Sequence, residues 1–155
     1  MMIRYKGTSQ QNYALDASLK LERACSSLER FLDRANAYGS LTPSQFRVLD
    51  VLYYLGSLSQ SVIGQKLFKS AGNMTMVIDH LEKKQFVRRR QSEQDRRVTK
   101  VELTDMGRRT YMETMQGYVD CIVQATSSLS PVELETLAVL CKKLGLSMMQ
   151  KGLPS

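Results

Sequence analysis

Cysteine and histidine are scarce in this chain, and their scarcity argues against a structural metal site. The 155 residues include three cysteines and a single histidine. The cysteines, Cys25, Cys121 and Cys141, share no short spacing, and one histidine cannot supply the mixed ligand set of a typical zinc site. We therefore expect no metal and no cofactor.

Long apolar stretches are missing as well. The first fifteen residues lack the apolar core of a signal peptide. No later run approaches the roughly 18 apolar residues that a membrane span requires. These absences predict a cytoplasmic protein with reduced thiols and no membrane partner.

The sequence also lacks the common signatures of catalysis. It contains no glycine-rich phosphate loop, no pair of metal ligands and no nucleophile placed beside a histidine base. We therefore predict that the protein is not an enzyme. The length and the hydrophobic content of 43% suit one domain with its own core, which we place at residues 1–155.

Positive charge is concentrated in one segment. Residues 83–109 contain ten basic and four acidic side chains, so this segment carries +6 of the chain's net charge of +7. A basic stripe attracts polyanions through counterion release, which favours nucleic acid as the partner. The alternative is a merely solvated surface.

Apolar periodicity and capping residues predict four helices in the first half of the chain. Apolar residues recur at helical spacing from Leu15 to Ala35. A capping box at Thr42-Pro43-Ser44-Gln45 starts a second helix, and Gly56 can close it. Ser59 can cap a short third helix, and Ser70 opens a fourth.

The second half predicts a basic hairpin followed by two long helices. The strands are expected at Phe86–Gln91 and Val98–Leu103. Thr104 caps the fifth helix and Ser130 the sixth, and both helices carry narrow heptad-like apolar seams. Such seams favour a partner helix, so we assign residues 10–38 and 105–150 to a homodimer interface. Packing within a monomeric bundle is the alternative.

The order of these elements is that of a winged helix-turn-helix. We therefore predict a mainly α (α+β) fold: a winged helix-turn-helix lobe at residues 40–104, with a two-stranded β wing, plus long N- and C-terminal helices. The fourth helix would enter the major groove, where Asn73 could pair with adenine and Thr75 or Met76 could contact thymine methyl groups. Ser70 would anchor a phosphate, and Arg96 and Arg97 would reach the minor groove.

Two side chains of the fourth helix have alternative interpretations. His80 could contact DNA, be simply solvated or, less plausibly, sense pH. Asp79 would be repelled by phosphates unless it accepts a hydrogen bond from cytosine or pairs with Lys83, and we treat it as structural.

From about Leu15 to Met149 the chain resembles the MarR family of transcriptional regulators. The resemblance is carried by Asn73-Met74-Thr75, Leu81-Glu82-Lys83-Lys84, Asp95-Arg96-Arg97 and Val101-Glu102-Leu103-Thr104-Asp105-x-Gly107. It implies a triangular homodimer whose two recognition helices enter successive major grooves of double-stranded DNA. It also implies that Asp95 steadies the wing through a nearby arginine. The predicted DNA-binding residues are Ser70, Asn73, Thr75, Met76, His80, Lys83, Arg88, Arg90, Asp95, Arg96 and Arg97.

The resemblance further implies a small aromatic or phenolic effector in a crevice between the dimer helices and the lobe. The candidate lining residues are Phe31, Tyr38, Phe46, Tyr53 and Tyr54, for which a plain core role is the alternative. Some relatives sense peroxides through a cysteine near the first helix. Cys25 is the candidate here, and a small apolar residue on the helix stripe is the alternative.

The predicted function is sequence-specific binding of double-stranded DNA. We expect a homodimeric transcriptional repressor that acts on a pseudo-palindromic operator and is released by an effector. The alternatives are a cysteine-based redox regulator of the same fold and a winged-helix module that binds another protein. The basic wing disfavours the second alternative, because the cores of protein interfaces are depleted of charge.

Overall fold

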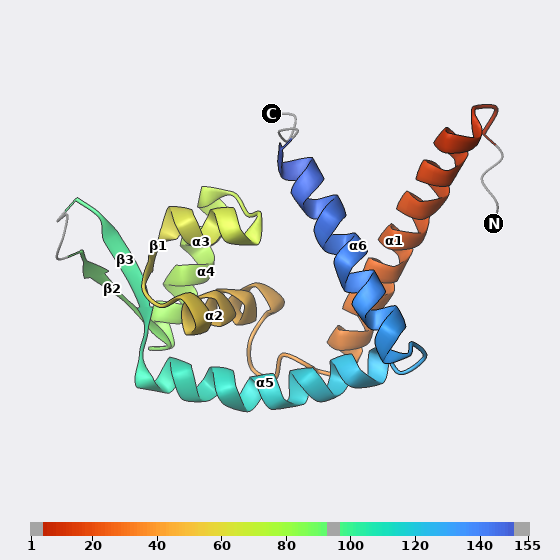
Figure 1. Ribbon diagram of the computed structural model, residues 1–155. Helices are drawn as coiled ribbons and strands as arrows, with labels where there is room; N and C mark the ends of the chain where they lie inside the picture. Colours follow the sequence, from red (N-terminus) through yellow and green to blue (C-terminus); the bar gives the residue numbers. More distant parts are fainter. Residues whose placement is uncertain (1–4, 93–96, 151–155) are drawn as a thin grey trace.

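The computed structural model describes residues 5–92 and 97–150 and shows a mainly helical fold with a small antiparallel sheet, as predicted (Figure 1). Among these residues, no helix is both long and apolar enough to cross a membrane. The elements are α1 Ser9–Arg34, α2 Pro43–Leu55, β1 Leu58–Ser59, α3 Gln60–Leu67, α4 Ala71–Lys83, β2 Val87–Gln91, β3 Thr99–Leu103, α5 Asp105–Ala125 and α6 Pro131–Gln150.

Capping boxes start three of the helices. The predicted box at Ser130 begins α6: the Ser130 N–H donates to Glu133 Oε2 at 2.8 Å, and the Glu133 N–H donates to Ser130 Oγ at 3.4 Å. At α2, the Thr42 hydroxyl accepts from the Gln45 backbone N–H at 3.2 Å, and the Gln45 side chain accepts from the Thr42 N–H at 3.1 Å. This confirms the predicted start of α2. A third box, formed by Thr8 and Gln11, starts α1 several residues before its apolar pattern begins.

The sheet has three strands in the order β1-β3-β2, although the sequence predicted only the hairpin. The added strand, β1, pairs Leu58 with Val101 and Ser59 with Lys100. Two residues are too few to show an alternating pattern, so this strand leaves no sequence signal. β1 joins the wing to the start of α3.

The core lies between α2, α3, α4, the sheet and the first half of α5. Tyr111 of α5 reaches into it and donates its hydroxyl to Asp50 Oδ1 at 2.6 Å. Burial, followed by the hydrogen bond to Asp50, raises the pKa of Tyr111 well above its ordinary value. The apolar side chains with no exposed surface are Phe46, Val48, Leu49, Ile63, Met74, Ile78 and Leu81.

The start of α5 is docked tightly against the turn between α4 and β2. A Cβ atom at Gly107 would lie 1.9 Å from the carbonyl oxygen of Phe86, so no side chain fits there. The Thr104 hydroxyl donates to the carbonyl of Gln85 at 2.6 Å. Gly107 therefore fixes α5 to the base of the wing.

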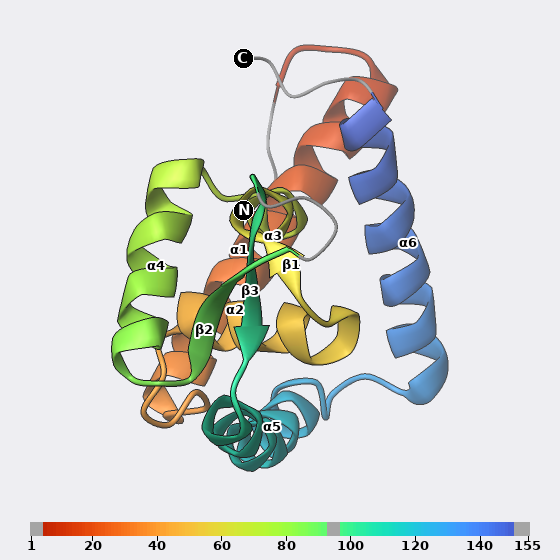
Figure 2. The ribbon, with the colours of Figure 1, turned by 90° about the vertical axis from the view of Figure 1, so that its left-hand side faces the viewer.

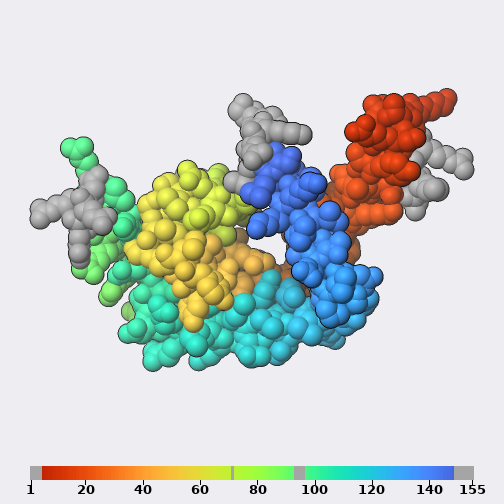
Figure 3. Space-filling view, viewed as in Figure 1, coloured from red at the N-terminus to blue at the C-terminus, as the bar shows by residue number. Residues whose placement is uncertain are grey.

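Helices α1 and α6 project away from this lobe (Figure 1). In the space-filling view an opening separates α6 from the lobe (Figure 3). Both helices keep large apolar side chains exposed, so the described residues leave much of their apolar surface uncovered. On α6 these are Val132, Leu137, Val139, Leu140, Leu144, Leu146 and Met148.

Candidate nucleic-acid interface

Helix α4 presents two faces with opposite character. Met74, Val77, Ile78 and Leu81 are buried against the lobe. The predicted DNA-contacting residues Asn73, Met76, His80 and Lys83 follow one another at intervals of three, four and three, and all are exposed. Met76 keeps 62% of its surface accessible although it is apolar. We call Asn73, Met76, His80 and Lys83 the open stripe.

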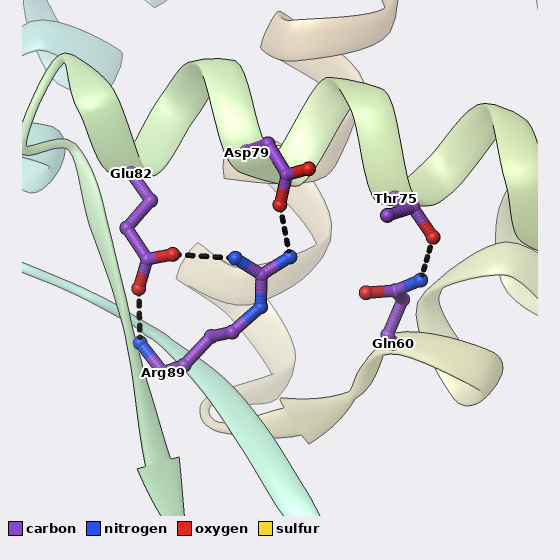
Figure 4. Close-up of polar contacts among 5 residues, drawn as sticks. All are labelled: Gln60, Thr75, Asp79, Glu82 and Arg89. Atoms are coloured by element: carbon purple, nitrogen blue, oxygen red, sulfur yellow. Dashed lines mark hydrogen bonds and ion pairs between the residues drawn. The ribbon is translucent and has the colours of Figure 1, made fainter.

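A third set of α4 residues, Thr75, Asp79 and Glu82, contacts neighbouring elements (Figure 4). Arg89 of β2 donates from Nη2 to Asp79 Oδ1 at 2.6 Å, and its Nη1 pairs with Glu82. The backbone N–H of Arg89 also donates to Glu82 Oε1 at 3.0 Å. These bonds tie the wing to the recognition helix.

The Arg89 guanidinium keeps its positive charge in this network. Burial alone would lower the pKa of the Arg89 guanidinium, but the hydrogen bonds and charges of Asp79 and Glu82 outweigh burial and raise it. Asp79 is therefore structural, with Arg89 as its partner in place of the suggested Lys83. The pairing was not visible in the sequence because it forms only when β2 folds back along α4.

Strand alternation separates the three consecutive arginines of the wing. Arg89 points to α4, whereas Arg88 and Arg90 belong to the other face of β2. Arg88 pairs across the hairpin with Glu102 at 2.6 Å and stays 65% exposed. Arg90 lies opposite Lys100, so the outer part of the hairpin concentrates positive charge.

The tip of the wing is only partly described. Arg97 lies just before β3 and is exposed. Asp95 and Arg96 fall outside the described residues, so the pairing of Asp95 with an arginine stays a prediction.

The open stripe and the wing lie side by side at one end of the molecule. Figure 2 looks along α3, with α4 on one side and strands β2 and β3 in front. Ser70 stands at the N-cap of α4, is exposed, and makes no capping hydrogen bond with its side chain. This surface combines an exposed helix face with a basic hairpin, which is the arrangement that a major groove and an adjacent minor groove accept.

The five predicted effector residues are not brought together. Tyr38 lines a cavity of about 510 Å³ with residues of α1, α2, α5 and the segment from α3 to α4. Tyr53 and Tyr54 line a separate groove of about 240 Å³ beside Tyr111. Phe46 is fully buried in the core, and Phe31 packs against the core at its edge.

Arg47 is a feature of the larger cavity that the sequence analysis did not single out. Its Nη2 donates to the Tyr118 hydroxyl at 2.9 Å, and its guanidinium lies 5.5 Å from the Tyr118 ring centre and 5.9 Å from that of Phe46. It forms no ion pair within the part of the chain that the structure describes. A charged residue between the apolar Phe46 and Val48 was the available signal.

Tyr38 and Cys25 also face this cavity. Burial and then the neighbouring Tyr118 raise the pKa of Tyr38, which outweighs the opposing effect of Arg47, so its hydroxyl stays protonated. Cys25 is an exposed free thiol within the protomer, not a covered member of the helix stripe.

Comparisons with known proteins agree with this geometry. The MarR family model matches residues 41–99. The HTH-type transcriptional regulator MhqR of Bacillus subtilis is 31% identical over 137 residues, which cover 88% of this chain and 94% of MhqR.

Solved structures show the same fold. A variant of MarR from Escherichia coli, complexed with operator DNA, superposes with a TM-score of 0.76 at 23% identity and covers 88% of this chain and 97% of that one. BpsR of Bordetella bronchiseptica, from a study of its regulation by 6-hydroxynicotinic acid, has a TM-score of 0.76 at 22% identity and covers 84% and 98%. The similarity to MhqR, together with the matching family model, shows that the chain belongs to the MarR family of DNA-binding transcriptional regulators, which are not enzymes.

Proposed function

We propose that this protein is a homodimeric repressor that binds a pseudo-palindromic operator and is released by a small effector. The observation that carries the proposal is the open stripe of α4, held in a fixed relation to a basic wing by Arg89. A major groove about 12 Å wide accepts one such helix. The MarR variant of similar fold was crystallised with operator DNA, which supports the same role here.

The proposed contacts follow from the exposed side chains. Asn73 is assigned to adenine, Met76 and the Thr75 methyl group to thymine, and Ser70 to a phosphate. His80 and Lys83 continue the open stripe along the groove. The wing residues Arg88, Arg90, Arg96 and Arg97 would meet the backbone and the flanking minor groove, with Asp95 steadying them.

The dimer is supported by the uncovered apolar residues of α1 and α6. Exposed apolar patches of this extent mark interaction surfaces. We assign residues 10–38 and 105–150 to dimerisation and residues 40–104 to the DNA-binding lobe of a single domain spanning residues 1–155. Two-fold symmetry would then place two recognition helices one helical turn apart.

The larger cavity is the proposed effector site. Its aromatic wall at Tyr38 and Tyr118 suits a ring, and the cation of Arg47 suits a carboxylate or phenolate. BpsR is regulated by 6-hydroxynicotinic acid, an aromatic acid, and this supports the same class of ligand here. Cys25 lines the same cavity, so an oxidant acting there is the alternative signal; Cys25→Ser would abolish a response to peroxide but spare one to an aromatic acid.

The first experiment is fluorescence anisotropy of the protein on the duplex upstream of its own gene and on a scrambled duplex, across a salt series. We expect preference for the native duplex at two protomers per site and a steep fall of affinity with salt. Arg97→Ala should weaken binding to both duplexes and reduce the salt slope, whereas Asn73→Ala should relax preference at one base pair per half-site. Weak and equal binding to both duplexes would contradict regulation at this site.

A further inference from the structure

Gln60, a residue outside the predicted interface, is bonded to the recognition helix. It is the first residue of α3, and its Nε2 donates to Thr75 Oγ1 at 2.6 Å (Figure 4). The bond joins the two helices of the helix-turn-helix through their side chains. The amide of Gln60, at the start of α3, therefore lies against the second turn of α4.

The amide of Gln60 keeps unused hydrogen-bonding capacity. A glutamine side chain has two N–H donors and a carbonyl acceptor, and Thr75 takes one donor. Among the described residues, nothing bonds to the carbonyl Oε1 or to the second N–H of Gln60. One donor and one acceptor on the same planar group thus remain available.

The position of Gln60 places this group beside the open stripe. In Figure 2 the end of α3 that follows β1 faces the viewer, with α4 on one side and the strands of the wing in front. Thr75 directly precedes Met76 and lies two residues beyond Asn73. A partner that covers the open stripe would therefore also meet the Gln60 amide.

Adenine is the ligand whose chemistry matches the free groups. In the major groove its N6 donates and its N7 accepts, which complement an amide carbonyl and an amide N–H. The methyl group of Thr75 lies on the same residue that fixes the amide, and a thymine methyl is an apolar contact for it. The pair thus offers complementary groups for an A·T base pair.

We propose that Gln60 is a specificity-determining residue that reads one adenine in each half-site, with its amide held in place by Thr75. The inference rests on the proposed entry of α4 into the major groove. Fixing the amide before binding reduces the side-chain entropy that recognition would otherwise lose.

The test begins with selection of duplexes from a randomised 20-base-pair pool by the wild-type protein and by Gln60→Ala. The variant should lose about tenfold of its preference for adenine at one position of each half-site and keep the rest of the motif. Gln65→Ala is the matched control, because Gln65 lies on the same helix, is exposed, and makes no side-chain hydrogen bond to the described residues. It should select the wild-type motif.

Two further variants test the mechanism. Thr75→Val keeps a methyl group but removes the hydroxyl that holds the amide, so it should weaken preference at the same position. The double variant should lose little more than either single one, since the two residues act as a unit. Thermal unfolding followed by circular dichroism checks that each variant is folded.

The outcomes separate this inference from the proposed function. An unchanged motif for Gln60→Ala would overturn the inference. A uniform loss on every duplex, restored by Gln60→Lys, would also overturn it, because that pattern indicates a phosphate contact. If the wild-type protein enriches no motif at all, the proposed function fails before Gln60 is tested.

Discussion

The lobe formed by α2, α3, α4 and the sheet buries most of its apolar side chains within one chain, whereas α1 and α6 leave most of theirs exposed. In the lobe, residues such as Phe46, Ile63 and Leu81 have no accessible surface. On α6, the described side chains are exposed or at most half-buried. The lobe therefore has its own core, whereas the two projecting helices leave apolar surface uncovered among the described residues.

This difference suggests that the lobe and the projecting helices have separate roles, the first in DNA binding and the second in association. Helix α4 and the wing, which would contact DNA, pack on the same core and are joined by the ion pairs of Arg89. Their relative position is therefore fixed before DNA binds. In the proposed dimer the projecting helices would gain most of their burial by association, so their geometry would depend on what covers them.

Charge placed on α6 should separate the subunits. In Leu137→Glu with Leu144→Glu, four apolar side chains per dimer would be replaced, each worth about 1.5–3 kcal/mol when buried. We expect dimer dissociation to become at least about a thousandfold easier, measured by analytical ultracentrifugation. Leu55→Glu, on an exposed apolar residue of the lobe, should leave the assembly unchanged. A wild-type protein that is monomeric at micromolar concentration would contradict the assignment of α6 to a dimer interface.

A side chain at Gly107 should damage the lobe instead. Gly107→Ala places a methyl group against the carbonyl of Phe86, and backbone must shift to relieve the clash. We expect the free energy of unfolding to fall by about 3 kcal/mol, measured by urea denaturation. Gly72→Ala is the control, because nothing lies within 4 Å of its added Cβ. Equal stability of the two variants would mean that α5 is not docked as described.

Removal of Arg89 should uncouple the wing from α4. The Arg89 side chain is 27% exposed, but Asp79 and Glu82 are 46% and 38% exposed, so Arg89→Ala should lower stability by only about 1 kcal/mol. DNA affinity should fall more, by about tenfold, because two carboxylates lose their counter-charge near the phosphates. Arg88→Ala should change stability by less than about 0.5 kcal/mol, since the Arg88 side chain is 65% exposed. If Arg88→Ala lowered stability and Arg89→Ala did not, Arg88 and not Arg89 would be the arginine that joins the wing to α4.

Relief of backbone strain should stabilise the lobe slightly. Gln85 has φ of 60°, a left-handed conformation that costs a side-chain-bearing residue about 1–2 kcal/mol. Gln85→Gly should therefore raise the free energy of unfolding by about 1 kcal/mol, measured in denaturant. The same change at Gln65, which is helical, should lower it by about 1 kcal/mol. A loss at Gln85 would show that its side chain matters more than its backbone.

The smallest effect concerns the cap of α6. Hydrogen bonds from the backbone N–H and then the hydroxyl of Ser130 lower the pKa of Glu133. Because the pKa of Glu133 is lower in the folded state, the ionised side chain stabilises the helix at pH values above its ordinary pKa. This stabilisation is lost as the pH falls through the lowered pKa. Ser130→Ala should raise the pKa of Glu133 partway toward 4.5 in an NMR titration, whereas Ser128→Ala should leave it unchanged.

Elements with local signals were predictable from the sequence. The capping box at Thr42 and the glycine at Gly56 bound α2 as expected, and Thr104 caps α5. Each strand of the wing starts one residue later than predicted, at Val87 and Thr99. These signals are short-range, because capping and periodicity act over one or two helical turns.

Contacts between distant segments were not predictable. Arg89 is one of three adjacent arginines, and only strand direction tells which one reaches Asp79. The bond from Gln60 to Thr75 joins residues fifteen positions apart, and Arg47 meets Tyr118 seventy-one positions away. Such partners depend on the crossing of helices in three dimensions, which no local pattern records.

Helix α5 connects the lobe to the projecting helix α1. Its 21 residues span about 30 Å at 1.5 Å per residue. Near its start Tyr111 is fixed in the lobe, and farther along it runs beside α1 (Figure 1). A tilt of about 5° at the far end displaces the near end by about 2.6 Å, close to the roughly 3.4 Å rise of one base pair. If α4 enters a major groove as proposed, a tilt of this size in the projecting helices would shift the recognition helix by most of one base pair.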